Sequence, residues 1–255
     1  MKKINVTAQD RDVASFFAEN SILQKKFTSG AHNLSVDGTG KDVSVGETVG
    51  RRISEYICEK FVTDDKLCVV DLGTGRAHLP NQMDKLGIDA YGFEGAGELV
   101  GQGVYNKNKV ACCDLSVPFT DERLNKAFHL STSFELLEHI HRDHEDQFLK
   151  NLAYLSDYHL CSINVDGWPG VSSTHCNIKH PCCWGETFRK HGIECDFIGA
   201  APKARPDPAW AKKGFIPKEY APGADNEEFR DNVRFGQWDE WKFSIFCLLD
   251  LRGCK

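Results

Sequence analysis

The pattern of apolar and polar positions predicts a βαβ unit in the first half of the chain. A short run over 68–72 is apolar except for Asp71, which is typical of a buried parallel strand. After Gly-Thr-Gly at 73–75, apolar side chains recur at helical spacing until Gly87, and a second apolar run covers 90–93. In an open parallel sheet such a turn lies beyond the carboxyl end of a strand, where backbone N–H groups face a ligand. The pattern therefore predicts a ligand site at this turn.

Later apolar runs extend this unit into a larger α/β sheet. We expect further strands over 110–113, 127–130, 159–165, 195–200 and 243–251, and helices over 143–155 and 184–191. Amphipathic helices are expected around 13–23 and 49–61, so we predict an N-terminal helical cap over 1–60 and an α/β domain over 61–255. Residues 200–242 are rich in aromatic side chains and too long for a hairpin loop, which indicates an insertion.

Composition restricts the compartment and the partners. The formal net charge of −6 over 255 residues gives no field that attracts polyanions, and no strong basic patch favours a nucleic-acid substrate. No apolar run reaches membrane-spanning length, and the N-terminus lacks the apolar segment of a signal peptide. Several of the 11 cysteines lie within apolar runs, as free thiols do in a reducing compartment. We expect a cytoplasmic protein without a disulfide framework.

The glycine turn and the acid that follows it indicate a nucleoside cofactor. Glu94 ends the second strand, where a carboxylate can accept hydrogen bonds from both hydroxyls of a ribose. The dinucleotide fingerprint G-x-G-x-x-G requires glycine where this chain has His78, which disfavours an NAD-type cofactor. The stretch Asp71-Leu72-Gly73-Thr74-Gly75 resembles the first motif of class I S-adenosylmethionine-dependent methyltransferases, and Glu94 corresponds to the acid of their second motif. Ala77 stands where that family often has a third glycine.

This resemblance implies a fold and a cofactor. The implied fold is the Rossmann-like class I methyltransferase fold, a seven-stranded, mostly parallel sheet with an antiparallel last strand and helices on both faces. The implied cofactor is S-adenosyl-L-methionine, with S-adenosyl-L-homocysteine as product. The family pattern assigns the cofactor site to Asp71, Gly73, Thr74, Gly75, Glu94, Asp114, Leu115, Ser131 and Ser133.

Two later segments are expected to face the acceptor. The run Ser-x-Glu-x-x-Glu-His at 133–139 resembles small-molecule methyltransferases, and His175-x-Asn177 is similar to methyltransferases of glycan or small-molecule pathways, in which the His and Asn lie near the acceptor. Histidine, with a pKa of about 6.5, can accept a proton from a hydroxyl group. We therefore expect O-methylation of a small molecule or glycan hydroxyl by in-line transfer, with His175 as general base, His139 as the second candidate and no metal.

Three alternatives stay open. Glu135, Glu138 and His139 would share one face of a helical turn and, with His180, could bind a divalent metal, as in the small-RNA terminal 2′-O-methyltransferases that this segment also resembles. The same side chains could instead brace the helix. A non-catalytic S-adenosylmethionine-binding module would carry the same cofactor motifs. The oligomeric state is not indicated.

A structural zinc site is disfavoured in the segment that follows the fifth expected strand. Its possible ligands contain no C-x-x-C pair, and the two adjacent cysteines would point in different directions. These possible ligands are His175, Cys176, His180, Cys182 and Cys183.

Overall fold

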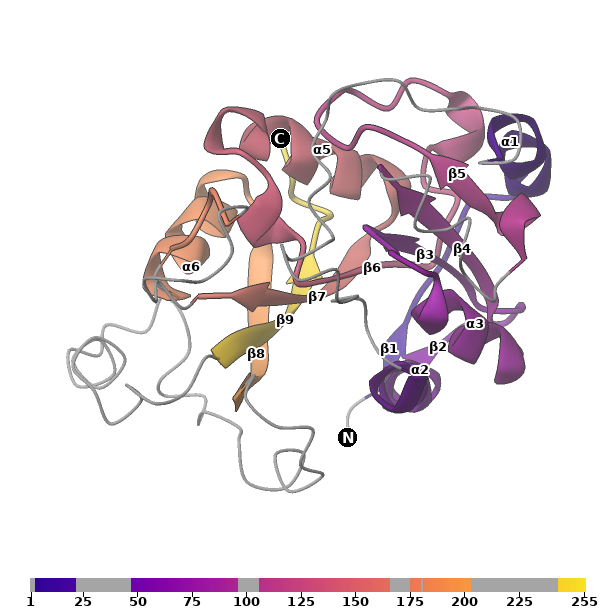
Figure 1. The fold of residues 1–255 in the computed structure, drawn as a ribbon, viewed down its shortest axis with the longest axis horizontal. Helices are drawn as coiled ribbons and strands as arrows, with labels where there is room; N and C mark the ends of the chain where they lie inside the picture. The colour runs from indigo at the N-terminus through magenta and orange to yellow at the C-terminus, as the bar shows by residue number, and fades with distance from the viewer. Residues whose placement is uncertain (1–2, 22–46, 96–105, 166–174, 180, 203–242) are drawn as a thin grey trace.

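A seven-stranded sheet forms the centre of the computed structural model, which describes residues 3–21, 47–95, 106–165, 175–179, 181–202 and 243–255 (Figure 1). The strand order is β5 (Val110–Cys112), β4 (Asp89–Glu94), β3 (Cys68–Leu72), β6 (Leu130–Phe134), β7 (Tyr158–Asn164), β9 (Phe243–Asp250) and β8 (Glu194–Pro202). The first five of these strands are parallel, and β9 runs antiparallel to both β7 and β8. The predicted sheet, mostly parallel with an antiparallel last strand, is confirmed.

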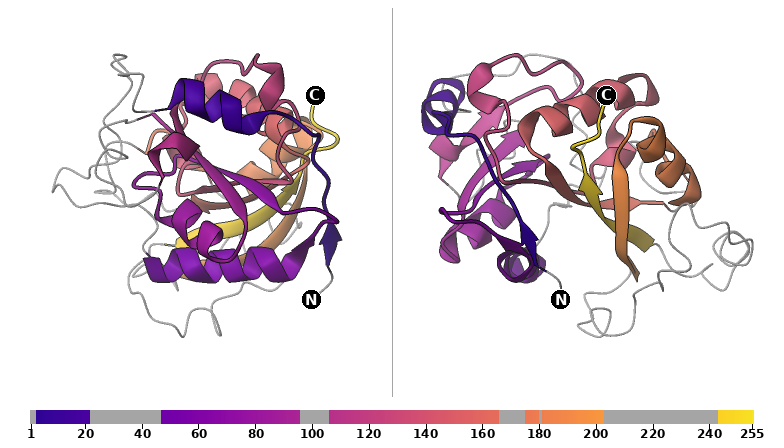
Figure 2. Two further views of the ribbon diagram at one scale, coloured as in Figure 1. Left: turned by 90° about the vertical axis from the view of Figure 1, so that its right-hand side faces the viewer. Right: turned by 180° about the vertical axis from the view of Figure 1, so that it is seen from behind.

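Helices cover both faces of this sheet (Figure 2). One apolar cluster joins the sheet to α1 (Val13–Asn20), α5 (Glu145–Leu155) and α6 (Pro181–Lys190). The other joins the opposite face to α2 (Glu47–Lys60) and α3 (His78–Lys85). A two-stranded parallel sheet, β1 (Ile4–Asn5) with β2 (Phe61–Val62), adds Val6 and Phe61 to this second cluster.

The N-terminal helices belong to these two layers. α1 and α2 lie on opposite faces of the sheet, as the left view of Figure 2 shows. The cap function expected for residues 1–60 stays a prediction, since 22–46 lie outside the described residues. Most of the expected insertion at 200–242 also lies outside the described residues. None of the described helices is long and apolar enough to cross a membrane.

The sequence of α5 shows why these layers form. Four large apolar residues, Phe148, Leu149, Leu152 and Leu155, recur at helical spacing and are buried against the sheet. Burial of each such side chain stabilises the fold by about 1.5–3 kcal/mol. Glu145 and Asp146 in the first turn of α5 interact favourably with the positive end of the helix dipole.

Two expectations from the apolar pattern were wrong in detail. The fourth strand, expected at 127–130, begins at Leu130 and continues through Ser131, Thr132 and Ser133. These hydroxyl side chains are fully buried and find partners inside the protein, so a strand forms although its sequence is polar. Leu86, expected as the last apolar position of the helix that stops at Gly87, follows the last residue of α3 and is 43% exposed.

Candidate functional site

The glycine turn after β3 folds over the end of β4. The backbone N–H groups of Gly73 and Thr74 both donate to the carbonyl oxygen of Phe93, at 2.9 and 3.1 Å. Gly73 and Gly75 have φ angles of +65° and +57°, in the left-handed region that favours glycine. A Cβ atom at Gly73 would lie 2.7 Å from the Leu136 side chain. The turn therefore requires glycine for its backbone conformation and for its close approach to the segment after β6.

Glu94 lies beside this turn, as the sequence predicts. Its side chain belongs to the last residue of β4 and is 7% exposed, and its Oε2 accepts a hydrogen bond from the Gly75 N–H at 2.6 Å. This bond fixes the carboxylate at the carboxyl end of the strand, next to the backbone that would face a nucleoside. The geometry is compatible with a carboxylate that holds a ribose.

The first turn of α3 opens onto the same edge of the sheet. Ala77 precedes the helix with a φ of +58° and provides no side-chain cap. The first N–H groups of a helix carry a partial positive charge and suit anionic groups. Ala77 thus adopts the left-handed conformation for which the methyltransferase motif often uses glycine.

Asp71 is buried beneath the turn. It is 4% exposed, and its Oδ1 accepts a hydrogen bond of 2.7 Å from the hydroxyl of Thr132, its neighbour in the sheet. Burial raises the pKa of Asp71 to about 7, although the bond from Thr132 acts in the opposite direction. The carboxyl group can therefore gain or lose its proton near neutral pH.

The segment expected to hold the adenine follows β5. Asp114 Oδ1 accepts hydrogen bonds from the N–H and the hydroxyl of Ser116, at 2.9 and 2.6 Å, and Leu115 is buried against the α5 face of the core. The buried Asn151 on α5 donates to the carbonyl oxygens of Leu115 and Val117, at 2.9 and 2.8 Å. Sequence reasoning missed Asn151, whose only signal is a polar residue on the apolar face of a helix.

Ser131 and Ser133, which the family pattern assigns to the cofactor site, have buried side chains. Both side chains are 0% exposed and point at the ring of the buried His159, with Ser131 Oγ 2.8 Å from Nδ1 and Ser133 Oγ 2.8 Å from Nε2. Burial lowers the pKa of His159 to about 3, so this ring is neutral at physiological pH. The two hydroxyl groups satisfy a buried imidazole on the α5 side of the sheet, and the assignment of these residues to the cofactor site stays a prediction.

Glu138, His139 and His175 come together at the carboxyl edge of the sheet. Each offers one ligand atom, and these atoms all lie within 4.8 Å of one another. The imidazole rings of His139 and His175 meet edge to face, with centroids 4.6 Å apart. The two histidines predicted from separate motifs are thus neighbours, beside a glutamate that is 0% exposed. His180 lies outside the described residues.

Glu135 does not share a helical face with these residues, contrary to the expectation. It has a φ of +57°, and the helical turn that follows is a 3₁₀ turn that starts only at Leu137. The Glu135 carboxylate accepts a hydrogen bond of 2.8 Å from the Ser162 hydroxyl on β7. The backbone reverses at Glu135, so its carboxylate braces the ends of two strands.

Asn177 is buried, and its expected place near an acceptor stays a prediction. It is 0% exposed, its N–H donates to the Glu138 carbonyl oxygen at 3.0 Å, and its side-chain amide donates to Glu145 at 2.7 Å. The Asn177 side chain therefore holds the segment 175–179 in place.

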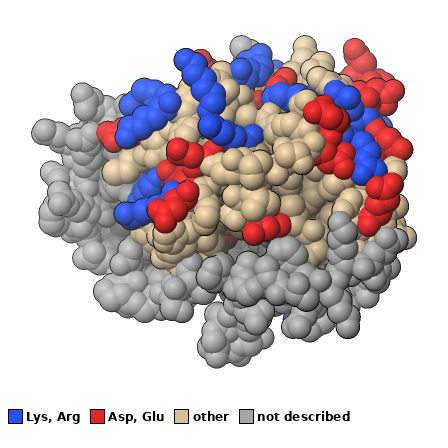
Figure 3. All heavy atoms as spheres, turned by 90° about the horizontal axis from the view of Figure 1, so that it is seen from above, with Lys and Arg blue, Asp and Glu red and all other residues tan. Residues whose placement is uncertain are grey.

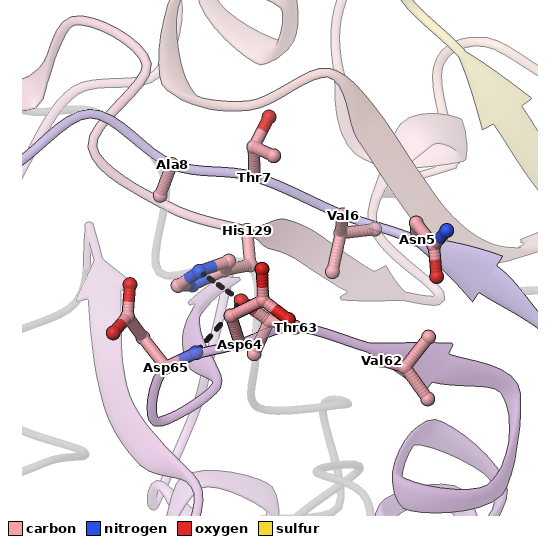
Figure 4. Close-up of a pocket in the computed structure, with 9 residues that line it drawn as sticks. All are labelled: Asn5, Val6, Thr7, Ala8, Val62, Thr63, Asp64, Asp65 and His129. Atoms are coloured by element: carbon pink, nitrogen blue, oxygen red, sulfur yellow. Dashed lines mark hydrogen bonds between the residues drawn. The ribbon is translucent and has the colours of Figure 1, made fainter.

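A hollow lies at the amino end of the strands, opposite the edge that carries Glu94 and the histidine pair (Figure 4). It has a volume of about 280 Å³ and is lined by residues around β1, by 62–65 and by His129. His129 Nε2 lies 3.0 Å from the Thr63 hydroxyl, and its Nδ1 accepts from the Cys68 N–H at 3.0 Å. The two ring nitrogens thus join the start of β6 to Thr63 and to the first residue of β3, which is a structural role.

Charges of both signs are interspersed on the face shown in Figure 3. Lysine and arginine side chains there alternate with aspartate and glutamate, and tan surface separates the groups. Such a mixed surface creates no strong field of one sign.

No protein-family model matches the chain, and no curated protein matches it. Among solved structures, the small-RNA methyltransferase HEN1 superposes with a TM-score of 0.52 at 10% identity, over 89% of this chain and 27% of that one. The Synechocystis PCC 6803 magnesium protoporphyrin IX methyltransferase, solved with bound S-adenosylmethionine, gives a TM-score of 0.48 at 13% identity, over 95% of this chain and 99% of that one.

A Haemonchus contortus phosphoethanolamine N-methyltransferase gives a TM-score of 0.49 at 12% identity and 78% coverage of this chain, which spans about half of that enzyme (51%). Together with the strand order, the likeness to HEN1 shows that the chain has the class I methyltransferase fold. The acceptors of these proteins differ, and at such low identity the likeness extends to the fold alone.

Proposed function

We propose that the protein is an S-adenosylmethionine-dependent methyltransferase that methylates a hydroxyl group of a small molecule or glycan. The observation that supports it best is the contact between the two halves of the site. Leu136, which packs against Gly73 of the cofactor turn, lies three residues before His139. The turn, Glu94 and the histidine pair thus occupy one edge of the sheet, where ligands of open α/β sheets bind.

The residues of this edge divide into a cofactor side and an acceptor side. Asp71, Gly73 and Gly75 would shape the methionine end, and Glu94 would hold the ribose. Asp114 and Leu115 would flank the adenine, with Asn151 fixing their loop. When bound, the cofactor supplies a methyl group on an electrophilic sulfonium.

The main task of the protein is alignment. Holding the acceptor oxygen in line with the methyl group and excluding water can lower the barrier by several kcal/mol without covalent catalysis. A hydroxyl acceptor must also lose its proton, and an imidazole nitrogen of His175, or of His139 beside it, would accept that proton. The edge-to-face contact holds the two candidate bases side by side, so both would face the same acceptor group.

Binding of S-adenosylhomocysteine tests the cofactor half of this proposal. Calorimetric titration of the wild type should give micromolar affinity, and Glu94→Gln should weaken it at least about tenfold, since the charged acceptor for the ribose is lost. Asp65→Asn, an exposed acid at the amino end of the strands, is the matched control and should change nothing. A folded wild-type protein that binds no S-adenosylhomocysteine would refute the proposal.

Turnover tests the acceptor half. A screen of hydroxyl-bearing metabolites and glycans, read out as S-adenosylhomocysteine formed, should yield an acceptor whose methylation falls strongly in His175→Ala. Full turnover of His175→Ala at saturating acceptor would remove His175 as the base. Tight cofactor binding with no acceptor in a broad screen would favour a non-catalytic binding module.

A second candidate function follows from the grouping of Glu138, His139 and His175. One carboxylate and two imidazoles form a donor set that suits divalent metals such as Mn²⁺, Zn²⁺ or Fe²⁺. We therefore retain metal-dependent 2′-O-methylation of an RNA end as the alternative. These residues would hold the metal, and its charge would stabilise the acceptor oxygen as the proton leaves.

Metal titration separates the two candidates. Calorimetry with Mn²⁺ should show a single site that is lost in Glu138→Gln if the alternative holds. A chelator that leaves turnover intact, together with no Mn²⁺ binding, would eliminate it and leave His175 as the base.

A further inference from the structure

A partly buried ion pair anchors the segment that carries His175. Lys179 Nζ forms a short ion pair with the carboxylate of Glu145, the first residue of α5, and the two side chains are only 15% and 14% exposed. The same ammonium group lies 3.0 Å from the Thr187 hydroxyl and 4.5 Å from the ring centroid of the buried Trp184. The pair therefore joins the segment 175–179 to both α5 and α6.

Asn177 uses the same carboxylate. Its side-chain amide donates to Glu145 Oε2 at 2.7 Å, and this is the oxygen that Lys179 contacts. One oxygen of Glu145 thus gathers two donors from the segment. Bonds to a charged group are stronger than neutral ones, and removal of one partner of a buried pair leaves the other charge uncompensated.

These contacts fix the backbone directly beside the histidine pair. Asn177 also donates from its backbone N–H to the carbonyl oxygen of Glu138, and Cys176 Sγ lies 3.3 Å from the carbonyl oxygen of His139. The chain from 175 to 177 therefore runs along the 3₁₀ turn that carries Glu138 and His139. A shift of Asn177 away from Glu145 would carry the His175 ring away from His139.

We propose that Glu145 is a positioning residue for the candidate catalytic pair, because it holds Asn177 and Lys179 and so sets the His175 ring against His139. This inference rests on the proposed function, in which these two rings face the acceptor. It assigns a role to the first residue of α5, which would act through Asn177 and Lys179. Glu145 belongs to none of the sequence motifs described above.

Nuclear magnetic resonance of the histidine rings tests this role. In protein with ¹³C-labelled histidine, the ring protons of His139 and His175 should show a mutual nuclear Overhauser effect and ring-current shifts, assigned with His139→Gln and His175→Ala. Glu145→Gln should abolish the effect and move the His139 resonances toward their positions in His175→Ala. Lys179→Met, which keeps an apolar side chain over Trp184, should do the same.

The neighbouring acid provides the matched control. Asp146 is also in the first turn of α5, and its carboxylate, with a side chain 77% exposed, lies 3.0 Å from His191 Nε2. Asp146→Asn should leave both histidine spectra unchanged. In the acceptor assay, Glu145→Gln should lower kcat about tenfold or more with little change in the KM for S-adenosylmethionine.

The outcomes distinguish a positioning role from a structural one. If Glu145→Gln or Lys179→Met lowers thermal stability but preserves the ring contacts, the network serves stability alone and the proposal is overturned. Absence of the ring contact in the wild type would overturn it as well. Failure of the wild type to bind S-adenosylhomocysteine would refute the proposed function while leaving the ring contact intact, so the two failures are distinguishable.

Discussion

Asp71 and His159 should impose opposite pH dependences on the stability of the fold. The pKa of Asp71 is raised from 3.8 to about 7 in the folded protein. Its contribution to stability is therefore complete below its unfolded pKa and is lost as the pH rises through 7. The pKa of His159 is lowered from 6.5 to about 3, so its contribution is complete above 6.5 and is lost as the pH falls toward 3.

The two windows overlap, and the two slopes should cancel there. Each group changes the free energy of unfolding by about 1.4 kcal/mol per pH unit within its window, with opposite signs. Between about pH 4 and 6.5 the sum of the two is therefore close to zero. Asp71→Asn removes the contribution that falls as the pH rises, and the amide oxygen of the new side chain can still accept a hydrogen bond from the Thr132 hydroxyl. As the pH rises from 4 to 6.5, the free energy of unfolding of the variant should therefore increase by about 3 kcal/mol relative to that of the wild type.

Urea unfolding followed by circular dichroism at half-unit pH intervals measures this difference. All other titrating groups are shared by the two proteins, so subtraction of the two curves isolates Asp71. His159→Gln should give the opposite result, a variant whose stability falls with rising pH over the same range. Parallel curves for Asp71→Asn and wild type would refute the reasoning, since they would mean that Asp71 titrates alike in the folded and unfolded states.

Two further predictions test the backbone and the buried serines. Gly192→Ala should destabilise the fold by more than about 3 kcal/mol, since its φ is +73° and a Cβ atom would lie 2.3 Å from the Gly253 carbonyl oxygen. Gly87→Ala should cost only about 1–2 kcal/mol, because its φ is +84° but a Cβ atom there would meet open space. Equal losses of stability in urea unfolding would contradict this difference. Ser133→Ala should lower stability by about 1–3 kcal/mol by leaving a His159 ring nitrogen without its hydroxyl partner, yet keep the S-adenosylhomocysteine affinity within about twofold.

The sequence predicts those parts of the fold that depend on local apolar pattern. Strands β3 and β4 are mostly apolar and have parallel partners on both sides, so their positions could be predicted to within one residue of the observed bounds. The glycine turn and Glu94 could be placed because they occupy the ends of those strands. The position predicted for β6 was wrong because its hydroxyl side chains find their partners in His159 and Asp71, and the sequence pattern does not reveal such partners.

The proposed acceptor side depends on contacts between distant residues, and there the sequence was least informative. Glu135 looks like part of a helical motif, but its left-handed backbone turns it toward Ser162. His175 and His139 were predicted separately, and nothing in their spacing indicates that they touch. Their proximity depends on Glu145, which binds Asn177 and Lys179 across more than thirty residues. Such pairings arise only when α5 and the segment 175–179 meet in the folded chain.

Ala77 shows how a departure from a family motif can be tolerated. Its left-handed φ costs an L-residue about 1–2 kcal/mol relative to glycine. Against this, glycine loses about 0.5–1 kcal/mol more conformational entropy on folding, and removal of the fully buried methyl group loses about 0.8 kcal/mol. These terms nearly cancel, so Ala77→Gly should change the free energy of unfolding by less than about 1 kcal/mol and leave S-adenosylhomocysteine binding unchanged. A larger gain in urea stability would show that the strain at Ala77 exceeds what its methyl group returns through burial, and that the third glycine of the motif is needed for stability.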